Sequence, residues 1–183
     1  MASDYPQLVT PRLILRPLEF ADAQAVQSVF PQWEIVRYMA SHIPWPYPPD
    51  AAVTYFRERA LPAIERGEEW HWTIRHKSNP GQLIGMITVQ DRPDENRGFW
   101  LDPAFHGQGL MTEAADAVTA YWFDALGREV LRAPKAIANE PSRRISRRAG
   151  MRVIATDERD YVSGRLPTEI WEITREEWQR RRS

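Results

Sequence analysis

The chemistry that is easiest to locate in this chain lies between Gly98 and Ala125, where a short apolar strand leads into a glycine-bearing loop and then an amphipathic helix. Pro103 ends the strand because it has no N–H to donate to a ladder. Gly107 and Gly109 let the backbone bend sharply and approach a ligand closely. Such a loop leaves backbone N–H groups at the positive end of a helix dipole. The segment therefore predicts a site for a phosphate or pyrophosphate.

The same pattern also fits a tight strand-to-helix turn that binds nothing. Two known phosphate-binding motifs do not match, because the loop contains neither Gly-Lys-Ser/Thr nor Gly-x-Gly-x-x-Gly. The chain has no cysteine, which excludes a cysteinyl acyl intermediate and a thiolate metal site. No metal is expected.

Residues 98–114 resemble the acetyl-CoA-binding core of GNAT-type N-acetyltransferases. The closest resemblance is to the RimJ/RimL-like branch, which acetylates the N-termini of ribosomal proteins. The general family motif is Gln/Arg-x-x-Gly-x-Gly/Ala. Gly109 matches its fourth position, whereas His106 and Met111 depart from its first and sixth positions. The resemblance covers nearly the whole chain, because it extends to residues 10–13, 139–142 and 148–151.

The resemblance implies that acetyl-CoA is the cosubstrate. Its pantetheine arm would enter a gap beside the strand that precedes the loop, where unpaired backbone groups bind it as they would an added strand. The strand residues implied in this contact are Phe99, Trp100 and Leu101. The loop residues implied in cofactor binding are His106, Gly107, Gln108, Gly109, Leu110, Met111 and Thr112. The imidazole of His106 could act as an acid or base, but its place in the loop favours a structural or phosphate-facing role.

Asn139 and Ser142 match the family's Asn-x-x-Ser pattern after the next predicted strand. By itself, Asn139 is a good helix N-cap. The resemblance implies that Asn139 lies near the pantetheine and that Ser142 lies near the leaving sulfur, which its hydroxyl could protonate. The attacking amine must lose a proton, and Glu95 and Asp160 are the carboxylates considered for this role. Asp160 precedes Tyr161 as an acidic residue does in the ribosomal-protein branch, yet both carboxylates also fit an ordinary surface position.

Two further groups of residues have both a structural and a functional interpretation. Residues 43–49 form a stiff loop rich in proline and aromatic residues, which either caps the core or forms a wall of the acceptor pocket. The resemblance favours the wall, so Trp45, Tyr47 and Trp70 are the predicted substrate-binding residues. Four arginines on one helix flank predict a solvated face from which one or two side chains meet phosphates. They are Arg143, Arg144, Arg147 and Arg148.

The remaining pattern predicts a single mixed α/β domain over residues 1–183. Strands are expected at 12–16, 70–75, 82–89, 98–101, 130–137, 151–155 and 168–174, with a loop through Tyr161 and Gly164 between the last two. Helices are expected at 22–30, at 50–67, after the glycine loop and at 139–150. Pro134 indicates an edge, a bulge or a splay. The charged tail 175–183 is expected to fray. The resemblance implies a GNAT fold with a central, mostly antiparallel, splayed sheet flanked by helices.

A chain of 183 residues can bury a substantial core. The net charge of −1 gives no electrostatic case for nucleic acid or an anionic membrane. The sequence has neither a bilayer-spanning apolar run nor a basic-then-apolar N-terminus, so a cytoplasmic protein is expected. A homodimer through an exposed Trp178 or through the strand that contains Pro134 is left open.

These observations together predict an acetyl-CoA-dependent N-acetyltransferase that transfers acetyl directly to a primary amine. The acceptor is either a protein N-terminal α-amine or a small molecule such as an amino acid, polyamine or antibiotic. A non-catalytic acyl-CoA-binding protein is the alternative from another class, and an acyl group other than acetyl is also left open.

Overall fold

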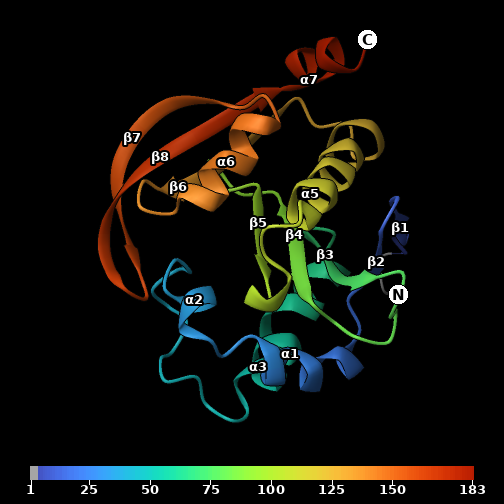
Figure 1. The fold of residues 1–183 in the computed structure, drawn as a ribbon, viewed down its shortest axis with the longest axis vertical. Helices are drawn as coiled ribbons and strands as arrows, with labels where there is room; N and C mark the ends of the chain where they lie inside the picture. The colour runs from blue at the N-terminus through green and yellow to red at the C-terminus, as the bar shows by residue number, and fades with distance from the viewer. Residues whose placement is uncertain (1–3) are drawn as a thin grey trace.

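The computed structural model describes residues 4–183, whose strands form two sheets (Figure 1). The first sheet has the order β1-β2-β3-β4-β5 and the second the order β6-β8-β7, with antiparallel neighbours throughout. The strands of the first are β1 (Leu8–Val9), β2 (Leu13–Pro17), β3 (Glu69–His76), β4 (Gly85–Gln90) and β5 (Arg97–Leu101). Those of the second are β6 (Val130–Ala136), β7 (Arg152–Tyr161) and β8 (Gly164–Thr174). The predicted splayed, mostly antiparallel sheet is confirmed.

The two sheets meet where β5 and β6 begin. The backbone N–H of Asn96 donates to the Arg132 carbonyl over 2.7 Å, and the N–H of Arg132 donates to Asn96 Oδ1 over 2.8 Å. Beyond this junction β5 and β6 belong to different sheets. Pro134 has no N–H to donate to a neighbouring strand, which favours the separation. The splay and the edge position predicted from this proline are confirmed.

Helices cover both faces of the first sheet. Trp100 of β5 contacts Phe30, which directly follows α1, whereas Trp72 of β3 contacts Tyr121 at the end of α5. These contacts place α1 and α5 on opposite faces. The helices are α1 (Ala23–Val29), α2 (Trp33–Val36), α3 (Ala51–Tyr55), α4 (Leu61–Glu65), α5 (Leu110–Ala120), α6 (Glu140–Arg148) and α7 (Arg175–Arg182). Short 3-10 turns lie at Phe20–Asp22 and Pro103–Phe105, and π-helical turns at Phe56–Ala60 and Tyr121–Ala125.

The helix predicted at 50–67 is present but changes its hydrogen bonding midway. The π-helical turn Phe56–Ala60 leads into α4, whose first turn contains Pro62. A proline removes one backbone donor, so the preceding turn must rearrange its hydrogen bonds. Asp50 precedes α3, but its side chain makes no capping hydrogen bond. The kink or new turn expected at Pro62 is therefore found, whereas side-chain capping by Asp50 is not.

The C-terminal third differs most from the sequence prediction. β7 and β8 form one long hairpin whose register extends to the pair Tyr161 and Gly164, so the predicted loop through these residues is wrong. The tail forms α7, because Thr174 and Glu177 make a capping box at its start. Trp178 is 8% exposed and packs on Phe123 at 5.3 Å. The prediction that an exposed Trp178 could form an interface is therefore wrong.

Candidate functional site

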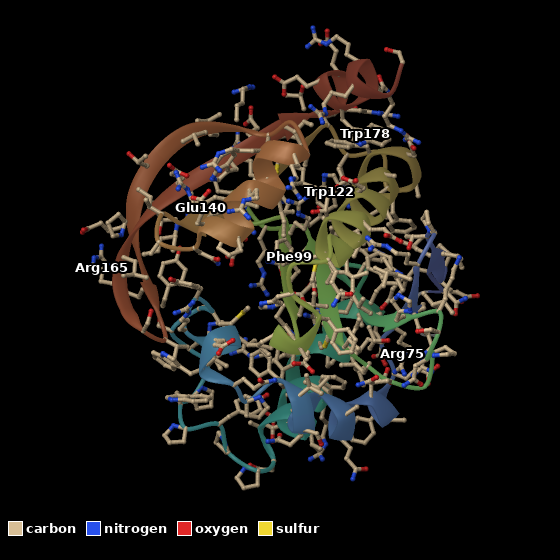
Figure 2. All side chains as sticks on the ribbon, in the orientation of Figure 1. Arg75, Phe99, Trp122, Glu140, Arg165 and Trp178 are labelled. Atoms are coloured by element: carbon tan, nitrogen blue, oxygen red, sulfur yellow. The ribbon has the colours of Figure 1, made fainter. Side chains whose placement is uncertain are left out.

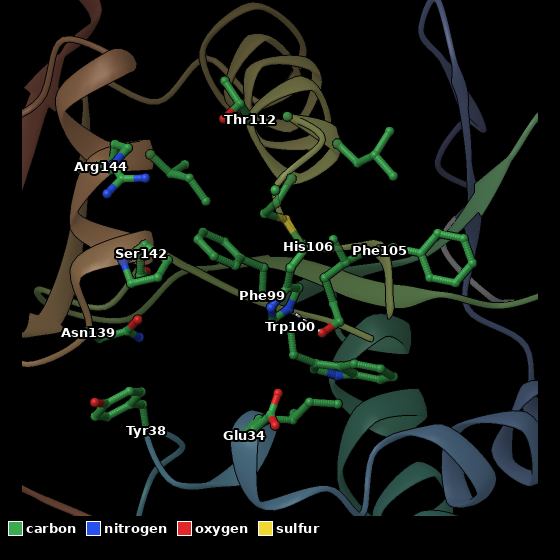
Figure 3. Close-up of a pocket in the computed structure, with 18 of the residues that line it drawn as sticks. Glu34, Tyr38, Phe99, Trp100, Phe105, His106, Thr112, Asn139, Ser142 and Arg144 are labelled. Carbon is green, nitrogen blue, oxygen red and sulfur yellow. Dashed lines mark hydrogen bonds between the residues drawn. The ribbon is translucent and has the colours of Figure 1, made fainter. Parts of the chain in front are cut away.

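A cleft of about 440 Å³ opens between β5 and the start of α6 (Figure 3). Its walls come from α2, from β5 with the glycine loop and the first turn of α5, and from α6 with the residues before it. The predicted strand residues Phe99, Trp100 and Leu101 all line it. The cleft therefore adjoins the place where the two sheets separate.

The glycine loop has the backbone that the sequence predicts. Gly107 and Gly109 both have φ of +75°, in the left-handed region that favours glycine. Gly109 is the N-cap of α5 and provides no side-chain cap, so first-turn N–H groups such as those of Leu110 and Met111 have no helical partner. Of the loop residues predicted to bind cofactor, all line the cleft except Gln108. These N–H groups and the helix dipole suit an anion.

A cluster of hydrogen bonds, which no sequence motif marks, fixes the loop and the first turns of α5 to the residues just before β2. Glu113 on α5 accepts bonds from the Thr10 hydroxyl at 2.5 Å and from the Arg12 backbone N–H and Nε, both at 2.7 Å. Arg12 Nη1 also donates to the Gln108 carbonyl over 2.8 Å. Burial alone would raise the pKa of Glu113, but the bonds from Thr10 and Arg12 lower it. The ionised carboxylate of Glu113 thus holds Thr10 and Arg12, and Arg12 in turn holds the loop at Gln108.

His106 anchors the other end of the loop. Its Nε2 lies 2.9 Å from the carbonyl oxygen of Leu101, the last residue of β5. A carbonyl only accepts, so Nε2 carries the proton and donates it to this bond. His106 also lines the cleft. This geometry gives the imidazole a structural role in shaping the loop.

Asn139 and Ser142 lie on the α6 wall of the cleft. Asn139 is the residue before α6, but its side chain makes no capping hydrogen bond, so the capping interpretation of its side chain is wrong. The Ser142 side chain is in a residue only 6% exposed, and its hydroxyl makes no hydrogen bond within residues 4–183. Both polar side chains are therefore available to a ligand in the cleft.

The four arginines of α6 divide into two rows. Arg143 and Arg147 form ion pairs with carboxylates, at 2.7 and 2.8 Å from Glu140 respectively, and Arg143 also pairs with Glu169. The other row, Arg144 and Arg148, lines the cleft. Two positive side chains therefore face the cleft, as the helical spacing predicts for one or two of them.

Neither carboxylate predicted as the general base lines the cleft. Asp160 lies on the exposed hairpin, with its side chain 62% exposed and paired with Arg165 at 3.1 Å. Figure 2 shows Arg165 at the outer edge of the hairpin, whereas Phe99 lies at the centre of the molecule. Glu95 lies between β4 and β5. The carboxylate that does line the cleft is Glu34 of α2, a helix of four residues that no sequence motif marks.

The predicted substrate-binding aromatics lie in three different environments. Tyr47 packs on Phe30 at 5.1 Å, and Phe30 packs on the cleft residue Trp100 at 5.2 Å. Trp45 is 40% exposed and does not line the cleft. Trp70 is buried in the core, 6% exposed, and does not line the cleft either. Only Tyr47 is therefore connected to the cleft through packed rings.

Two buried cations lie behind the cleft residue Phe99. Lys135 of β6 is 7% exposed, with its Nζ 4.2 Å from the centre of the Phe99 ring. Burial, together with the charge of Arg97, lowers the pKa of Lys135 to about 7. Burial also lowers the pKa of Arg97 to about 10, although its Nη1 donates to the Thr119 hydroxyl. Neither of these two basic side chains lines the cleft itself.

The hairpin tip and α2 join across one side of the cleft. The Val162 N–H donates to the Met39 carbonyl over 2.9 Å, and the Ser163 hydroxyl donates to the Arg37 carbonyl over 2.6 Å. The Tyr38 hydroxyl reaches the carbonyl of Ala138 over 3.2 Å. Figure 3 shows Tyr38 and Asn139 facing each other on this side. These bonds close a wall that would otherwise be open.

The described residues contain neither a metal-binding cluster nor a membrane-spanning helix. Residues 4–183 contain no group of three or more His, Cys, Asp or Glu side chains placed to hold a metal ion. No helix within the same range is both long and apolar enough to cross a membrane.

Comparison with known proteins gives the class of this protein, an acyltransferase, and its family. The acetyltransferase (GNAT) domain matches residues 12–152, so the chain belongs to the GNAT family, as its residues predict. A relative is the uncharacterized N-acetyltransferase YoaA of Bacillus subtilis, 28% identical over 151 residues that cover 80% of this chain and 82% of the relative.

Two solved structures show the same fold. The ribosomal-protein-S5-alanine acetyltransferase from Vibrio fischeri aligns with a TM-score of 0.81 and 12% identity, covering 95% of this chain and 99% of that chain. The microcin C7 self-immunity acetyltransferase MccE, in complex with acetyl-CoA and AMP, aligns with a TM-score of 0.74 and 16% identity, covering 93% of this chain and 97% of that chain.

Proposed function

We propose that this protein is an acetyl-CoA-dependent N-acetyltransferase and that its acceptor is the N-terminal α-amine of a protein. The observation that carries the proposal is one continuous cleft, which joins the free N–H groups at the start of α5 to the separated ends of β5 and β6. An anionic headgroup with a long extended arm matches both parts of this cleft.

The residues present fit acetyl-CoA. First-turn N–H groups of α5 would hold the pyrophosphate, and Arg144 and Arg148 would add positive charge. The open edge of β5 would pair with the amides of the pantetheine arm. The side chains of Asn139 and Ser142, which have no hydrogen-bond partner in the described chain, would complete the contacts. When bound, acetyl-CoA supplies an acetyl group already activated as a thioester.

The acceptor side of the cleft supports a slender cationic amine. Glu34 places a carboxylate on the α2 wall, and a protonated amine is attracted to such a charge. The bond from Ser163 to Arg37 ties the hairpin tip to the chain after α2 and restricts access from that side. A chain terminus needs less width than a side chain presented from the middle of a folded surface. The Vibrio fischeri neighbour is a ribosomal-protein-S5-alanine acetyltransferase, which supports the same acceptor class.

A small-molecule amine is the second candidate acceptor. The microcin C7 self-immunity acetyltransferase has the same fold, so this fold also occurs in an acetyltransferase with a self-immunity role. The cleft of about 440 Å³ has room for a small amine beside the thioester.

The test is release of CoA from acetyl-CoA with three sets of acceptors: peptides with free N-termini, the same peptides N-blocked, and small amines. We expect release with the free peptides only. Release with small amines alone would show instead that the acceptor is a small molecule such as a metabolite or an antibiotic. Binding of acetyl-CoA in calorimetry without release on any acceptor would support the non-catalytic alternative, and a matching panel of longer acyl-CoA donors would detect another acyl group.

A further inference from the structure

A chain of hydrogen bonds crosses β3 and β4 on the face that carries α1, and no step of the proposed function uses it. The Thr88 hydroxyl lies 2.8 Å from His71 Nδ1. His71 Nε2 lies 2.7 Å from Glu69 Oε2, and the other oxygen of Glu69 accepts from Arg92 at 2.5 Å. The side chain of His71 is 2% exposed and that of Glu69 is 10% exposed. A hydroxyl, an imidazole and a carboxylate are thus connected in series.

The ionisation of Glu69 fixes the direction of every proton in this chain. Burial alone would raise the pKa of Glu69, but its hydrogen bonds with His71 and Arg92 and the charge of Arg92 lower it. An ionised carboxylate only accepts, so His71 Nε2 carries a proton and Nδ1 of a neutral ring does not. Thr88 must then donate its hydroxyl proton to Nδ1. The lone pairs of Thr88 Oγ1 are then free to accept a proton from a bound molecule.

Thr88 lies beside the junction of the two sheets. In the β4–β5 register Thr88 is opposite Gly98, so their Cα atoms are about 5 Å apart. A Cβ added at Gly98 would meet no atom within 4 Å, and Gly98 is exposed, so open space adjoins Thr88 on this face. The next residue of β5 on the same face is Trp100, which lines the cleft. Thr88 therefore lies one strand away from the gap between β5 and β6, beside the end at which these two strands are joined, and it does not itself line the cleft.

A bound acetyl-CoA would bring the reacting groups towards this end. The glycine loop would hold the pyrophosphate at the open end of the gap, after the last residue of β5. An arm that extended from there along β5 would point towards Gly98 and the junction at Asn96. The acceptor amine must meet the arm's far end, and the packed rings of Tyr47, Phe30 and Trp100 form a wall on the same face.

Resting on the proposed function, we infer that Thr88 accepts the proton that the acceptor ammonium loses, with His71 and Glu69 as positioning residues that take up the charge. The proton leaves the nitrogen for Thr88 Oγ1 as the hydroxyl's own proton moves to His71 Nδ1. His71 becomes an imidazolium whose Nε2–H remains bonded to Glu69. The electron pair of the broken N–H bond stays on the nitrogen and forms the new bond to the acetyl carbonyl carbon. The C–S bond then breaks, and the second proton of the nitrogen goes to the sulfur, so that CoA leaves as the thiol.

Other ionisable groups surround this relay and set its response to pH. Arg92 follows β4 and shares Glu69 with His71. Tyr55 of α3 is close enough for the charge of Glu69 to affect it, although burial is the main reason why its pKa is raised to about 12. The Tyr5 hydroxyl bonds the backbone of His71, not its ring, and also accepts from the Leu18 N–H. Glu69 is therefore the anion in direct contact with the imidazole.

The first test replaces the hydroxyl without changing the shape of the side chain. We expect Thr88→Val to lower kcat on the order of 100-fold, the size of a lost acid–base group, while the Kd for acetyl-CoA in calorimetry stays unchanged. Thr88→Ser should keep kcat within about threefold, because it keeps the hydroxyl. The matched control is Thr73→Val in β3, whose hydroxyl bonds the Arg16 carbonyl outside the relay. Thr88→Val with wild-type kcat would overturn the inference.

The second test uses the pH profile, which a purely structural network would not move. Glu69→Gln removes the anion that stabilises the imidazolium, so the acid limb of kcat/KM should shift to lower pH. An unshifted limb in Glu69→Gln would overturn the inference. Failure of the proposed function is distinguishable, because it appears as absence of CoA release by the unaltered protein.

Discussion

The environment of the Ser142 hydroxyl predicts how much this group contributes to kcat. It is almost buried, lines the cleft and has no hydrogen-bond partner in the described chain. A thiolate leaves readily, so protonating it should contribute less than the roughly 100-fold that general acids typically supply. We expect Ser142→Ala to lower kcat on the order of 10-fold with little change in the KM for acetyl-CoA. Steady-state kinetics checks this.

The matched control lies on the same helix. Ser146 is one turn further along α6 and fully buried, and its hydroxyl has no hydrogen-bond partner among residues 4–183. Ser146→Ala removes a similar hydroxyl away from the cleft, so kcat should stay at the wild-type value. An equal loss of activity in the two variants would show that α6 itself, rather than the Ser142 hydroxyl, had been disturbed.

Lys135 predicts an unusual dependence of stability on pH. Burial lowers its pKa from 10.5 to about 7, so at neutral and lower pH the folded protein must carry a desolvated ammonium. Between about pH 7 and pH 10.5 the unfolded chain binds more protons than the folded one, and stability due to this group therefore rises with pH. Each pKa unit corresponds to about 1.4 kcal/mol, which sets an upper limit of about 5 kcal/mol.

Lys135→Met should therefore be more stable than the wild type. The difference in the free energy of unfolding should be largest near and below pH 7 and should shrink towards pH 10. Urea unfolding at several pH values measures it. A constant difference across this range would show that packing against Phe99, rather than the charge, decides the effect.

The sequence predicts the cofactor side of the site far better than the acceptor side. Phe99 and the glycine loop occupy one continuous stretch, so local backbone rules are enough to place them together. Glu34 comes from a four-residue helix, and Thr88 meets His71 only through the register of β3 and β4. Such long-range pairing leaves no local pattern. The base candidates Glu95 and Asp160 were chosen from local context, and neither reaches the cleft.

At the scale of elements, the strand predicted at 151–155 is too short because the alternation that would reveal the rest of β7 is missing. Nearly every residue of β7 is exposed, so its sequence has no apolar side to reveal it. The strand is stabilised instead by its backbone pairing with β8 and by cross-strand ion pairs such as Asp160 with Arg165. The charged tail was misjudged for a related reason, because a single buried tryptophan, Trp178, docks α7.

The strand–loop–helix element gives a sharp test of backbone geometry. Gly109 has φ of +75°, and a Cβ there would come 3.5 Å from Arg12, an ordinary contact. Gly109→Ala should therefore cost about 1 to 2 kcal/mol through the left-handed backbone alone. If the loop relaxes to relieve this strain, its N–H groups move and the affinity for acetyl-CoA should fall about 10-fold, measured by calorimetry.

Gly127 provides the matched variant for this element. It has φ of +65° with open space around its Cβ position, and it lies at the other end of the helical segment. Gly127→Ala should lower the melting temperature by a few degrees, about as much as Gly109→Ala, but leave the Kd for acetyl-CoA unchanged. Weaker binding in both variants would mean that helix stability, rather than loop geometry, controls the affinity.

At the scale of the whole molecule, the cleft lies across the boundary between the two sheets. The backbone bond from Asn96 to Arg132 joins the sheets at one end, and the bond from Ser163 to Arg37 joins the hairpin tip to the chain near α2. Between these points β5 and β6 are not paired. A ligand that binds the edge of β5 and the start of α6 would therefore connect the two sheets along the stretch where their strands are not paired.

This arrangement predicts how CoA and its nucleotide fragment should differ. At 100 times its Kd, either ligand should stabilise the protein by about 2.7 kcal/mol, because linkage depends only on saturation. For a chain of this size that raises the melting temperature by roughly 5 to 10 °C. Adenosine 3′,5′-bisphosphate lacks the pantetheine arm, so at equal saturation it should slow amide exchange in the glycine loop alone. CoA should also slow exchange in β5 and at Asn139, and equal protection by the two ligands would show that the arm does not bridge the sheets.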